Sequence, residues 1–356
     1  MSKPIKISFP HMGDYSIPIS RLFRDLFPQA EIMPAPPITQ KTVELGARCS
    51  PDFVCSPFKY NLGNYIEALE KCANVLFQTG MGCRYAYYGA VQEQILRDMG
   101  YQFDFICLSR EKAHPDAAYA TCKRLNPDLN PAVFVHALLL AVERIRIMDK
   151  LDRLLRQRIG FEVNSGEFEK AKKSLLRAIE KADTVWELQQ ISKGYGEIYR
   201  NIEVDMPENP LRVGIVGELY TLMEPFSNHN LEKKLAGAGI ALTRQMSVTF
   251  LLFGKRDKKS LKESGSYLNF LVGANGADSV SQCRKYAEKG YDGILHIKSF
   301  GCAPELSAQP ALMTLSQDYH IPILHLSFDT QSSETGLETR LEAFIDMIQM
   351  KKRAVK

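Results

Sequence analysis

The sequence has 356 residues, of which 45% are hydrophobic and 24% are charged, as in an ordinary globular protein with a sizeable core. The formal net charge of +4 is small and spread along the chain, so it indicates neither a nucleic-acid nor a membrane-surface ligand. No run reaches about 18 apolar residues, and the start of the chain lacks the apolar core of a signal peptide. We therefore expect a soluble, cytoplasmic protein.

The first segment, residues 1–126, alternates short apolar runs typical of strands with stretches of helical spacing. The predicted strands are residues 5–9, 31–35, 74–79 and 103–108. The predicted helices are residues 17–26, 39–47 and 88–99. Such alternation predicts a parallel sheet with helices on both faces.

The middle segment, residues 127–206, has long helical patterns over residues 133–156 and 167–182 and no convincing strand. Within it, Thr184 and Glu187 have the spacing of a capping box. This change of character predicts a helical domain.

The last segment, residues 207–356, returns to strand–helix alternation after a proline-rich break. The predicted strands are residues 211–216, 240–243, 292–297 and 323–328. The predicted helices are residues 226–236, 279–288, 308–317 and 339–349. The predicted fold is therefore α/β, with two Rossmann-like lobes of parallel sheet flanking a helical middle region.

Four of the eight cysteines lie in glycine- or proline-containing loops. Cys49 and Cys55 share one loop between two predicted helices, whereas Cys83 and Cys302 each follow the end of a predicted strand. Ligand sites in open parallel sheets lie outside the carboxyl ends of the strands. Because cytosolic thiols stay reduced, these cysteines are better candidates for metal ligands than for disulfides.

The residues around these cysteines suit a bulky, negatively charged cofactor. Gly80, Gly82 and Gly301 would let the backbone approach such a group closely. Basic residues near the cysteines would offset the charge of thiolates, and these are Lys59, Arg84 and Lys298.

Two other interpretations of these cysteines stay open. Structural zinc sites usually have two close cysteine pairs, a spacing that this chain lacks but that does not exclude zinc. Cys302 as a nucleophile would need a base, for which His296 is a candidate, although a strand histidine is more often packed and hydrogen-bonded. The remaining cysteines are interpreted as structural, and they are Cys72, Cys107, Cys122 and Cys283.

Several segments together resemble a known family. They are Phe-Val-Cys-Ser-Pro-Phe-Lys at 53–59, Gly-Cys-Arg-Tyr at 82–85, His-Ile-Lys-Ser-Phe-Gly-Cys-Ala-Pro-Glu at 296–305 and Thr-Arg-Leu-Glu-Ala-Phe at 339–344. They resemble signatures of the 2-hydroxyacyl-CoA dehydratase and double-cubane-cluster superfamily, and most of all its acyl-CoA dehydratase activase-related (CoA-enzyme-activase-like) branch.

The resemblance implies an iron–sulfur protein with Cys55, Cys83 and Cys302 as ligands and Cys49 as a candidate fourth ligand. It implies a 4Fe–4S or double-cubane cluster and electrons from a separate activase ATPase of the sugar kinase/heat-shock chaperone/actin fold. Three thiolates would leave one iron open for substrate, whereas four would suit electron transfer.

Two departures from the family pattern limit what is carried over. Asp329-Thr330 stands where the family has an Asp-Glu pair, and the chain has no P-loop, so it is not expected to be the activase itself. Candidates for catalytic residues are His11, Glu218 and Arg84.

The expected function is an ATP-activated, low-potential reductase or dehydratase-like component, working anaerobically on a small molecule or CoA thioester, with a homodimer as a candidate assembly. The alternatives are a non-catalytic electron-transfer or cluster-carrier protein and a structural zinc protein of the same fold.

Overall fold

The computed structural model describes residues 4–80, 83–109, 115–254 and 257–354. The chain divides into two compact units, of which unit 1 comprises residues 1–145 and 178–188 and unit 2 comprises residues 146–177 and 189–356. Three helices contribute residues to both units, and they are α6 (Pro131–Arg158), α7 (Glu167–Lys181) and α8 (Val185–Asn201). They match the helical patterns of the middle segment, while a separate helical domain over residues 127–206 stays a prediction.

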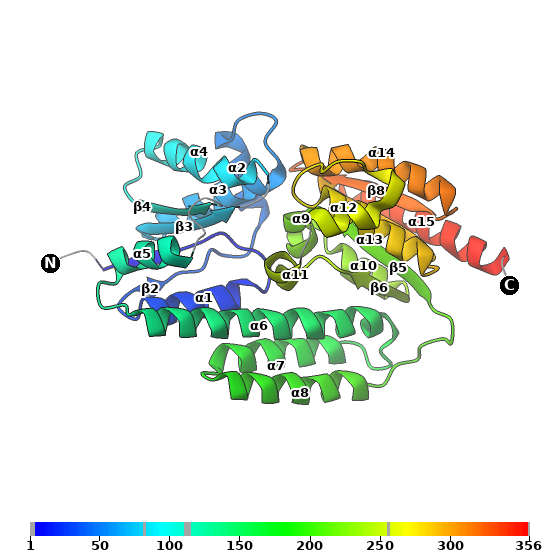
Figure 1. Cartoon of the computed structure of the whole chain (residues 1–356), viewed down its shortest axis with the longest axis horizontal. Helices are drawn as coiled ribbons and strands as arrows, with labels where there is room; N and C mark the ends of the chain where they lie inside the picture. The colour runs from blue at the N-terminus through cyan, green and yellow to red at the C-terminus, as the bar shows by residue number, and fades with distance from the viewer. Residues whose placement is uncertain (1–3, 81–82, 110–114, 255–256, 355–356) are drawn as a thin grey trace. The chain divides into compact units, whose positions relative to one another are not determined.

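Unit 1 contains a four-stranded parallel sheet with the strand order β2-β1-β3-β4 (Figure 1). Its strands are β1 (Lys6–Ser8), β2 (Glu31–Ile32), β3 (Val75–Gly80) and β4 (Asp104–Ser109). Its helices, besides parts of α6–α8, are α1 (Ser16–Leu26), α2 (Gln40–Cys49), α3 (Ser56–Glu70), α4 (Tyr85–Asp98) and α5 (Pro115–Leu125).

Side-chain alternation along β3 gives this sheet two apolar faces. Phe77 packs against Phe23 of α1, with ring centroids 4.6 Å apart, and belongs to the core on that side. Leu76 points the other way and packs in a second core with Phe58 and Leu62 of α3. Both faces are therefore covered, as the sequence predicts for a parallel sheet.

Unit 2 contains a second four-stranded parallel sheet with the order β6-β5-β7-β8. Its strands are β5 (Leu211–Gly217), β6 (Ile240–Arg244), β7 (Gly293–Ser299) and β8 (Ile323–Phe328). Its longer helices are α13 (Gly276–Glu288), α14 (Ala303–Asp318) and α15 (Glu334–Ala354). Its shorter helical segments are η1 (Ile159–Phe161), α9 (Leu219–Met223), η2 (Phe226–Asn228), α10 (Leu231–Gly237), α11 (Val248–Phe253), α12 (Asp257–Ser264) and η3 (Gly265–Tyr267).

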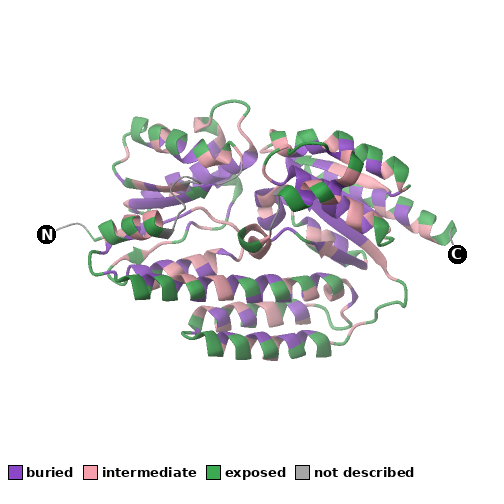
Figure 2. Cartoon of the chain, in the orientation of Figure 1, coloured by how far each residue is buried: buried purple, intermediate pink, exposed green. Residues whose placement is uncertain are grey.

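Every residue of β7 is buried, as expected for a central strand between two layers of helices (Figure 2). The predicted fold class is thus confirmed: the protein is α/β, with two parallel sheets flanked by helices. Among the described residues, no helix combines the length and the apolar character that are needed to cross a bilayer.

Several element boundaries differ from the sequence prediction. The helix predicted over residues 226–236 is interrupted, because His229 and Asn230 have left-handed backbone angles with φ of 53° and 55°. The strand predicted over residues 31–35 is only two residues long. α14 begins five residues earlier than predicted, which makes Cys302 its N-cap residue.

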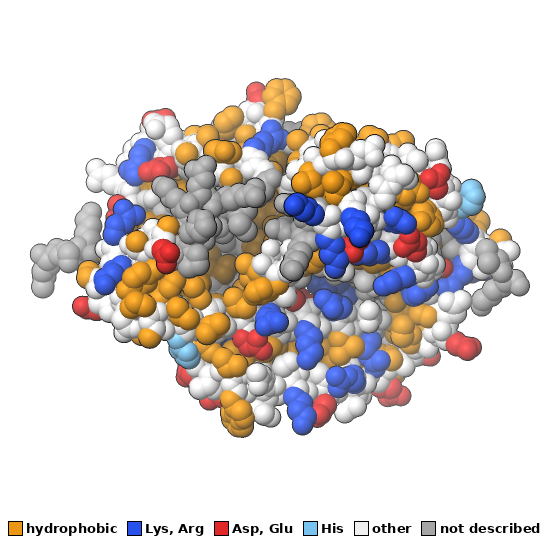
Figure 3. Space-filling model, viewed as in Figure 1, with side chains coloured by type: hydrophobic (Ala, Val, Ile, Leu, Met, Phe, Trp, Pro, Cys, Tyr) orange, Lys and Arg blue, Asp and Glu red, His pale blue; other side chains and the backbone are white. Residues whose placement is uncertain are grey.

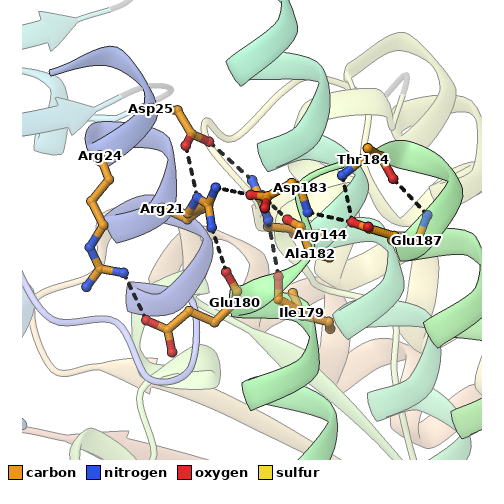
Figure 4. Close-up of polar contacts among 10 residues, drawn as sticks. All are labelled: Arg21, Arg24, Asp25, Arg144, Ile179, Glu180, Ala182, Asp183, Thr184 and Glu187. Carbon is orange, nitrogen blue, oxygen red and sulfur yellow. Dashed lines mark hydrogen bonds and ion pairs between the residues drawn. The ribbon is translucent and has the colours of Figure 1, made fainter. Parts of the chain in front are cut away.

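Arg144 of α6 joins α7 and α1 within unit 1 (Figure 4). Its side chain is completely buried, and it donates to the carbonyl oxygens of Ile179 (3.3 Å) and Ala182 (2.7 Å). The carbonyls of a helix's last turn lack partners within the helix, so the guanidinium satisfies groups that would otherwise be unpaired. Asp25 of α1 lies 3.7 Å from the same guanidinium.

The start of α8 has the predicted capping box, which is also drawn in Figure 4. Glu187 N donates to Thr184 Oγ1, and Thr184 N donates to Glu187 Oε2, both at 3.1 Å. This prediction is confirmed.

Basic side chains gather over α12 on the visible face of unit 2 (Figure 3). Lys258, Lys259 and Lys262 of this helix are exposed, and Glu263 forms an ion pair with Lys285 at 2.7 Å. The small net charge of the chain does not by itself predict this local positive surface.

Candidate functional site

The two neighbouring central strands of unit 1, β1 and β3, lead into helices whose connections run to opposite sides of the sheet. The crevice at such a point is where open α/β sheets bind ligands. His11 follows β1, and Cys83 and Arg84 follow β3 at this edge of the sheet. Gly82 lies outside the described residues.

The loop that carries His11 is fixed by α3. The backbone N–H of His11 donates to Asn64 Oδ1 at 3.0 Å, and Asn64 Nδ2 donates to the Pro36 carbonyl at 3.3 Å. Asn64 is completely buried, so this pairing satisfies groups that are costly to leave unpaired.

Cys55 is the N-cap residue of α3 and has a defined sulfur environment. Its Sγ lies 2.9 Å from Tyr88 Oη, while the Tyr88 ring packs edge-on against Phe58 with centroids 4.8 Å apart. Burial, followed by the neighbouring Cys55, raises the pKa of Tyr88. Tyr88 therefore keeps its proton at neutral pH and can donate it to the sulfur.

Cys83 lies at the start of α4, immediately before its N-cap residue Arg84. The backbone N–H of Tyr85 donates to Cys83 Sγ at 3.4 Å, and Tyr85 Oη accepts from Asn61 Nδ2 at 2.6 Å. Both the Cys55 and Cys83 sulfurs thus contact donors in the first turn of α4. A helix N-terminus favours thiolates, because its unpaired N–H groups and dipole stabilise negative charge.

Gly80 is required by its packing against α4. A Cβ added at this position would lie 2.8 Å from the Tyr85 carbonyl oxygen and 2.9 Å from Ala86 Cα. The close backbone approach expected here is therefore made by α4 itself.

Cys49 and Lys59 belong to the tightly packed pair α2 and α3. The sequence predicted Cys49 in a loop, but it is the last residue of α2. It is half-buried against the core between α3 and α4. A Cβ at Gly46 would lie only 1.8 Å from the Lys59 carbonyl, so the two helices need glycine there. The half-buried Lys59 lies in the first turn of α3, one turn after Cys55.

Buried polar atoms that the sequence did not predict lie on β1, α3 and β3. Within the described part of the chain, Ser8 Oγ, Asn61 Oδ1 and Gln78 Nε2 are buried without a hydrogen-bond partner. Gln78 Oε1 accepts from Tyr65 Oη of α3 at 2.9 Å, so this side chain faces α3. Unpaired buried polar atoms in native structures usually indicate bound water, an ion or a ligand.

In the sheet of unit 2, β5 and β7 are the neighbouring central strands that correspond to β1 and β3. Glu218 follows β5 and caps α9, accepting from Tyr220 N at 2.7 Å and from Thr221 N at 2.9 Å. Burial raises the pKa of Glu218, these hydrogen bonds oppose the rise, and nearby Glu305 adds to it. Glu218 therefore caps a helix, and a catalytic role for it stays a prediction.

Cys302 follows β7 and precedes α14. Lys298 of β7 is only 4% exposed, and burial lowers the pKa of its ammonium, while Cys302 and Glu305 oppose this change. The cation therefore lies close enough to Cys302 to offset a thiolate, as the sequence predicts.

His296 does not serve as a base for Cys302. Its Nε2 lies 2.9 Å from Glu305 Oε2, and its Nδ1 lies 2.9 Å from His325 Nδ1. The packed, hydrogen-bonded interpretation of His296 is correct. Glu305 and His325, which complete this cluster, had no signal in the sequence beyond their positions near predicted strand ends.

The structural cysteines differ in burial. Cys122 and Cys283 are buried in helices, where burial raises the pKa of Cys122 to about 11 and that of Cys283 further. Cys72 is exposed after α3, and Cys107 lies within β4. High thiol pKa values suit buried apolar cysteines better than metal ligands.

The environments of Cys55, Cys83 and Cys302 fit thiolate ligation, because each is half-buried and close to hydrogen-bond donors or a cation. Across the described ranges, no three His, Cys, Asp or Glu side chains are grouped closely enough to hold one metal ion. Of the candidate ligands, Cys302 belongs to unit 2, and unit 1 contains Cys49, Cys55 and Cys83.

No protein-family model matches the chain, and no curated protein matches it significantly. The resemblance to the 2-hydroxyacyl-CoA dehydratase superfamily stays a prediction carried by its motifs.

Proposed function

We propose that this chain is a cytoplasmic iron–sulfur protein of the 2-hydroxyacyl-CoA dehydratase-like type. Cys55, Cys83 and Cys302 would be ligands of a 4Fe–4S-type cluster, with Cys49 as an additional candidate. The observation that carries the proposal is the contact of the Cys55 and Cys83 sulfurs with donors in the first turn of α4.

The chain's own residues would prepare these ligands. The Tyr85 N–H donates to Cys83 Sγ, and Tyr88 Oη can donate to Cys55 Sγ; such bonds stabilise thiolates and raise the potential of a bound cluster. Lys298 supplies positive charge near Cys302. When bound, the cluster would supply low-potential single electrons.

We further propose that the protein acts as a reductase or dehydratase-like component that receives electrons from a separate activase ATPase. This part rests on the motif resemblance. The structure supports an electron-accepting role through one feature, which is that the candidate cysteines are half-buried and therefore partly accessible.

The test is the iron and acid-labile sulfide content per chain after anaerobic purification, with an EPR spectrum of the dithionite-reduced protein. About four irons would indicate one cubane, and about eight would indicate the double-cubane type. Zinc in place of iron would overturn the redox proposal and favour the structural zinc protein.

Single variants then test the ligand set. Cys55→Ala, Cys83→Ala and Cys302→Ala should each lose iron and sulfide, whereas the exposed control Cys72→Ala should keep both. Full retention of iron and sulfide by Cys83→Ala would exclude the proposed site.

A further inference from the structure

Three polar side chains form a continuous hydrogen-bonded chain in unit 2. His296, in the middle of β7, is completely buried between Glu305 of α14 and His325 of β8, with both contacts at 2.9 Å. The parallel register places His325 directly opposite His296 on the neighbouring strand. Ser279 of α13 donates to the second carboxyl oxygen of Glu305 at 3.1 Å.

The hydrogen-bonding capacity of these groups gives the chain a direction. A carboxylate only accepts, so His296 Nε2 carries a proton and donates to Glu305. Nδ1 of the neutral His296 ring must then accept, which requires that His325 Nδ1 carries a proton and donates. The remaining lone pair of the His325 ring is on Nε2.

His325 is placed to exchange protons with solvent. Its ring is half-buried, and Nε2 has no hydrogen-bond partner among the described residues and is not one of the buried unpaired atoms. Burial, with smaller effects from the charges of His296, Lys298 and Arg340, lowers the pKa of His325 to about 4. The ring is therefore neutral at pH 7 and available as an acceptor.

We propose that Glu305, His296 and His325 form a proton relay, with Nε2 of His325 as an acid–base site at the surface of unit 2. A proton that binds this Nε2 releases the Nδ1 proton of His325 to Nδ1 of His296. The Nε2 proton of His296 then passes to Glu305. Both rings end neutral with their tautomers exchanged, Glu305 ends as a carboxylic acid, and no electron moves.

Charged groups from three elements lie around the relay. Glu218, after β5, lies close enough to Glu305 that the Glu305 charge helps to raise the pKa of Glu218. Lys298 of β7 lies near Glu305, and Arg340 of α15 holds β8 by donating to the His325 carbonyl at 2.6 Å. Glu305 is a completely buried carboxylate in the first turn of α14, at the inner end of the relay.

The inner end of the relay, Glu305, lies near the candidate ligand Cys302, because Cys302 is the N-cap residue of α14 and Glu305 is in its first turn. The charges of both residues affect the pKa of Lys298. If the proposed cluster reduces a substrate there with electrons from the activase, the reduced substrate would take up protons, and the relay would supply one of them. That use rests on the function proposed above, whereas the relay itself does not.

The test is long-range ¹H–¹⁵N spectroscopy of the full chain labelled at its seven histidines. Signals are assigned with His296→Gln, His325→Gln and, as a matched control, His136→Gln on the exposed surface of α6. If a core variant does not fold, through-bond spectra of the unmodified chain supply the assignment instead. At pH 7 we expect the Nε2–H tautomer for His296 and the Nδ1–H tautomer for His325.

On acidification the signals of both rings should change together, because a proton that binds Nε2 of His325 moves the proton shared between the two Nδ1 atoms. An Nδ1–H tautomer or a doubly protonated ring at His296 at pH 7, or a His325 titration without a response of His296, would overturn the relay. The tautomers are measured independently of the iron content. The experiment can therefore refute the relay without refuting the cluster, and the iron measurement can refute the cluster without refuting the relay.

Discussion

Replacing Arg144 with methionine tests how unit 1 holds the end of α7. Methionine keeps much of the buried volume and removes the guanidinium that donates to the carbonyls of Ile179 and Ala182 (Figure 4). Each carbonyl left unpaired in the interior costs about 1–3 kcal/mol. Nη1 of Arg144 is itself buried without a hydrogen bond, so its removal relieves part of that cost. We expect a net loss of about 3 kcal/mol, within the range for breaking a buried charged pair.

The assay is urea unfolding of the full chain, and the matched control is Arg24→Met. Arg24 forms an ion pair with Glu180 at 2.9 Å, but their side chains are 47% and 41% exposed. Exposed pairs contribute at most about 1 kcal/mol, so the control should shift the midpoint little. With a slope of about 3 kcal/mol/M, Arg144→Met should lower the midpoint by about 1 M. Equal shifts for the two variants would show that the cost of burying the guanidinium cancels its hydrogen bonds.

Three further predictions concern the sites. Tyr88→Phe keeps the packed ring and loses the hydrogen bond to Cys55, so unfolding should become easier by about 0.5–1.5 kcal/mol in urea. Gly46→Ala should cost more than about 2 kcal/mol, because its Cβ would collide with a carbonyl of α3, whereas Gly194→Ala, with open space, should gain about 1 kcal/mol by the same assay. The pKa of His325 is lowered to about 4, below the unfolded value of 6.5, so the unfolded chain binds the proton first. Stability should therefore fall as the pH decreases from 6.5 to 4, by about 1–2 kcal/mol after solvent screening, and His325→Gln should lack this part of the slope in thermal melts.

Controls separate these effects from general destabilisation. Tyr87→Phe, on a ring that is 72% exposed, should change stability by less than about 0.5 kcal/mol. A Gly46→Ala protein as stable as the parent would mean that α2 and α3 can separate at no cost. An unchanged pH slope in His325→Gln would mean that this ring titrates normally in the folded chain.

Periodicity along the chain determined the fold class. Short apolar runs such as residues 211–216 and 323–328 indicated strands, and their alternation with helices predicted parallel pairing. The positions of Cys83 and Cys302 beyond the carboxyl ends of strands were also predicted, and each lies three residues after the last residue of its strand. Element ends were less certain, since left-handed angles at His229 and Asn230 depend on local packing that has no periodic signal.

The sequence by itself determined which residue types lie at the sheet edges, because that depends only on local order along the chain. The tertiary structure decided their partners. The contact of Cys55 with Tyr88 joins residues 33 positions apart, and that of His296 with His325 joins residues 29 apart. Such contacts depend on helix packing and on strand register, and a register shift of one residue would turn His325 to the other face of its sheet. A single sequence does not contain that register, and only the folded sheet fixes it.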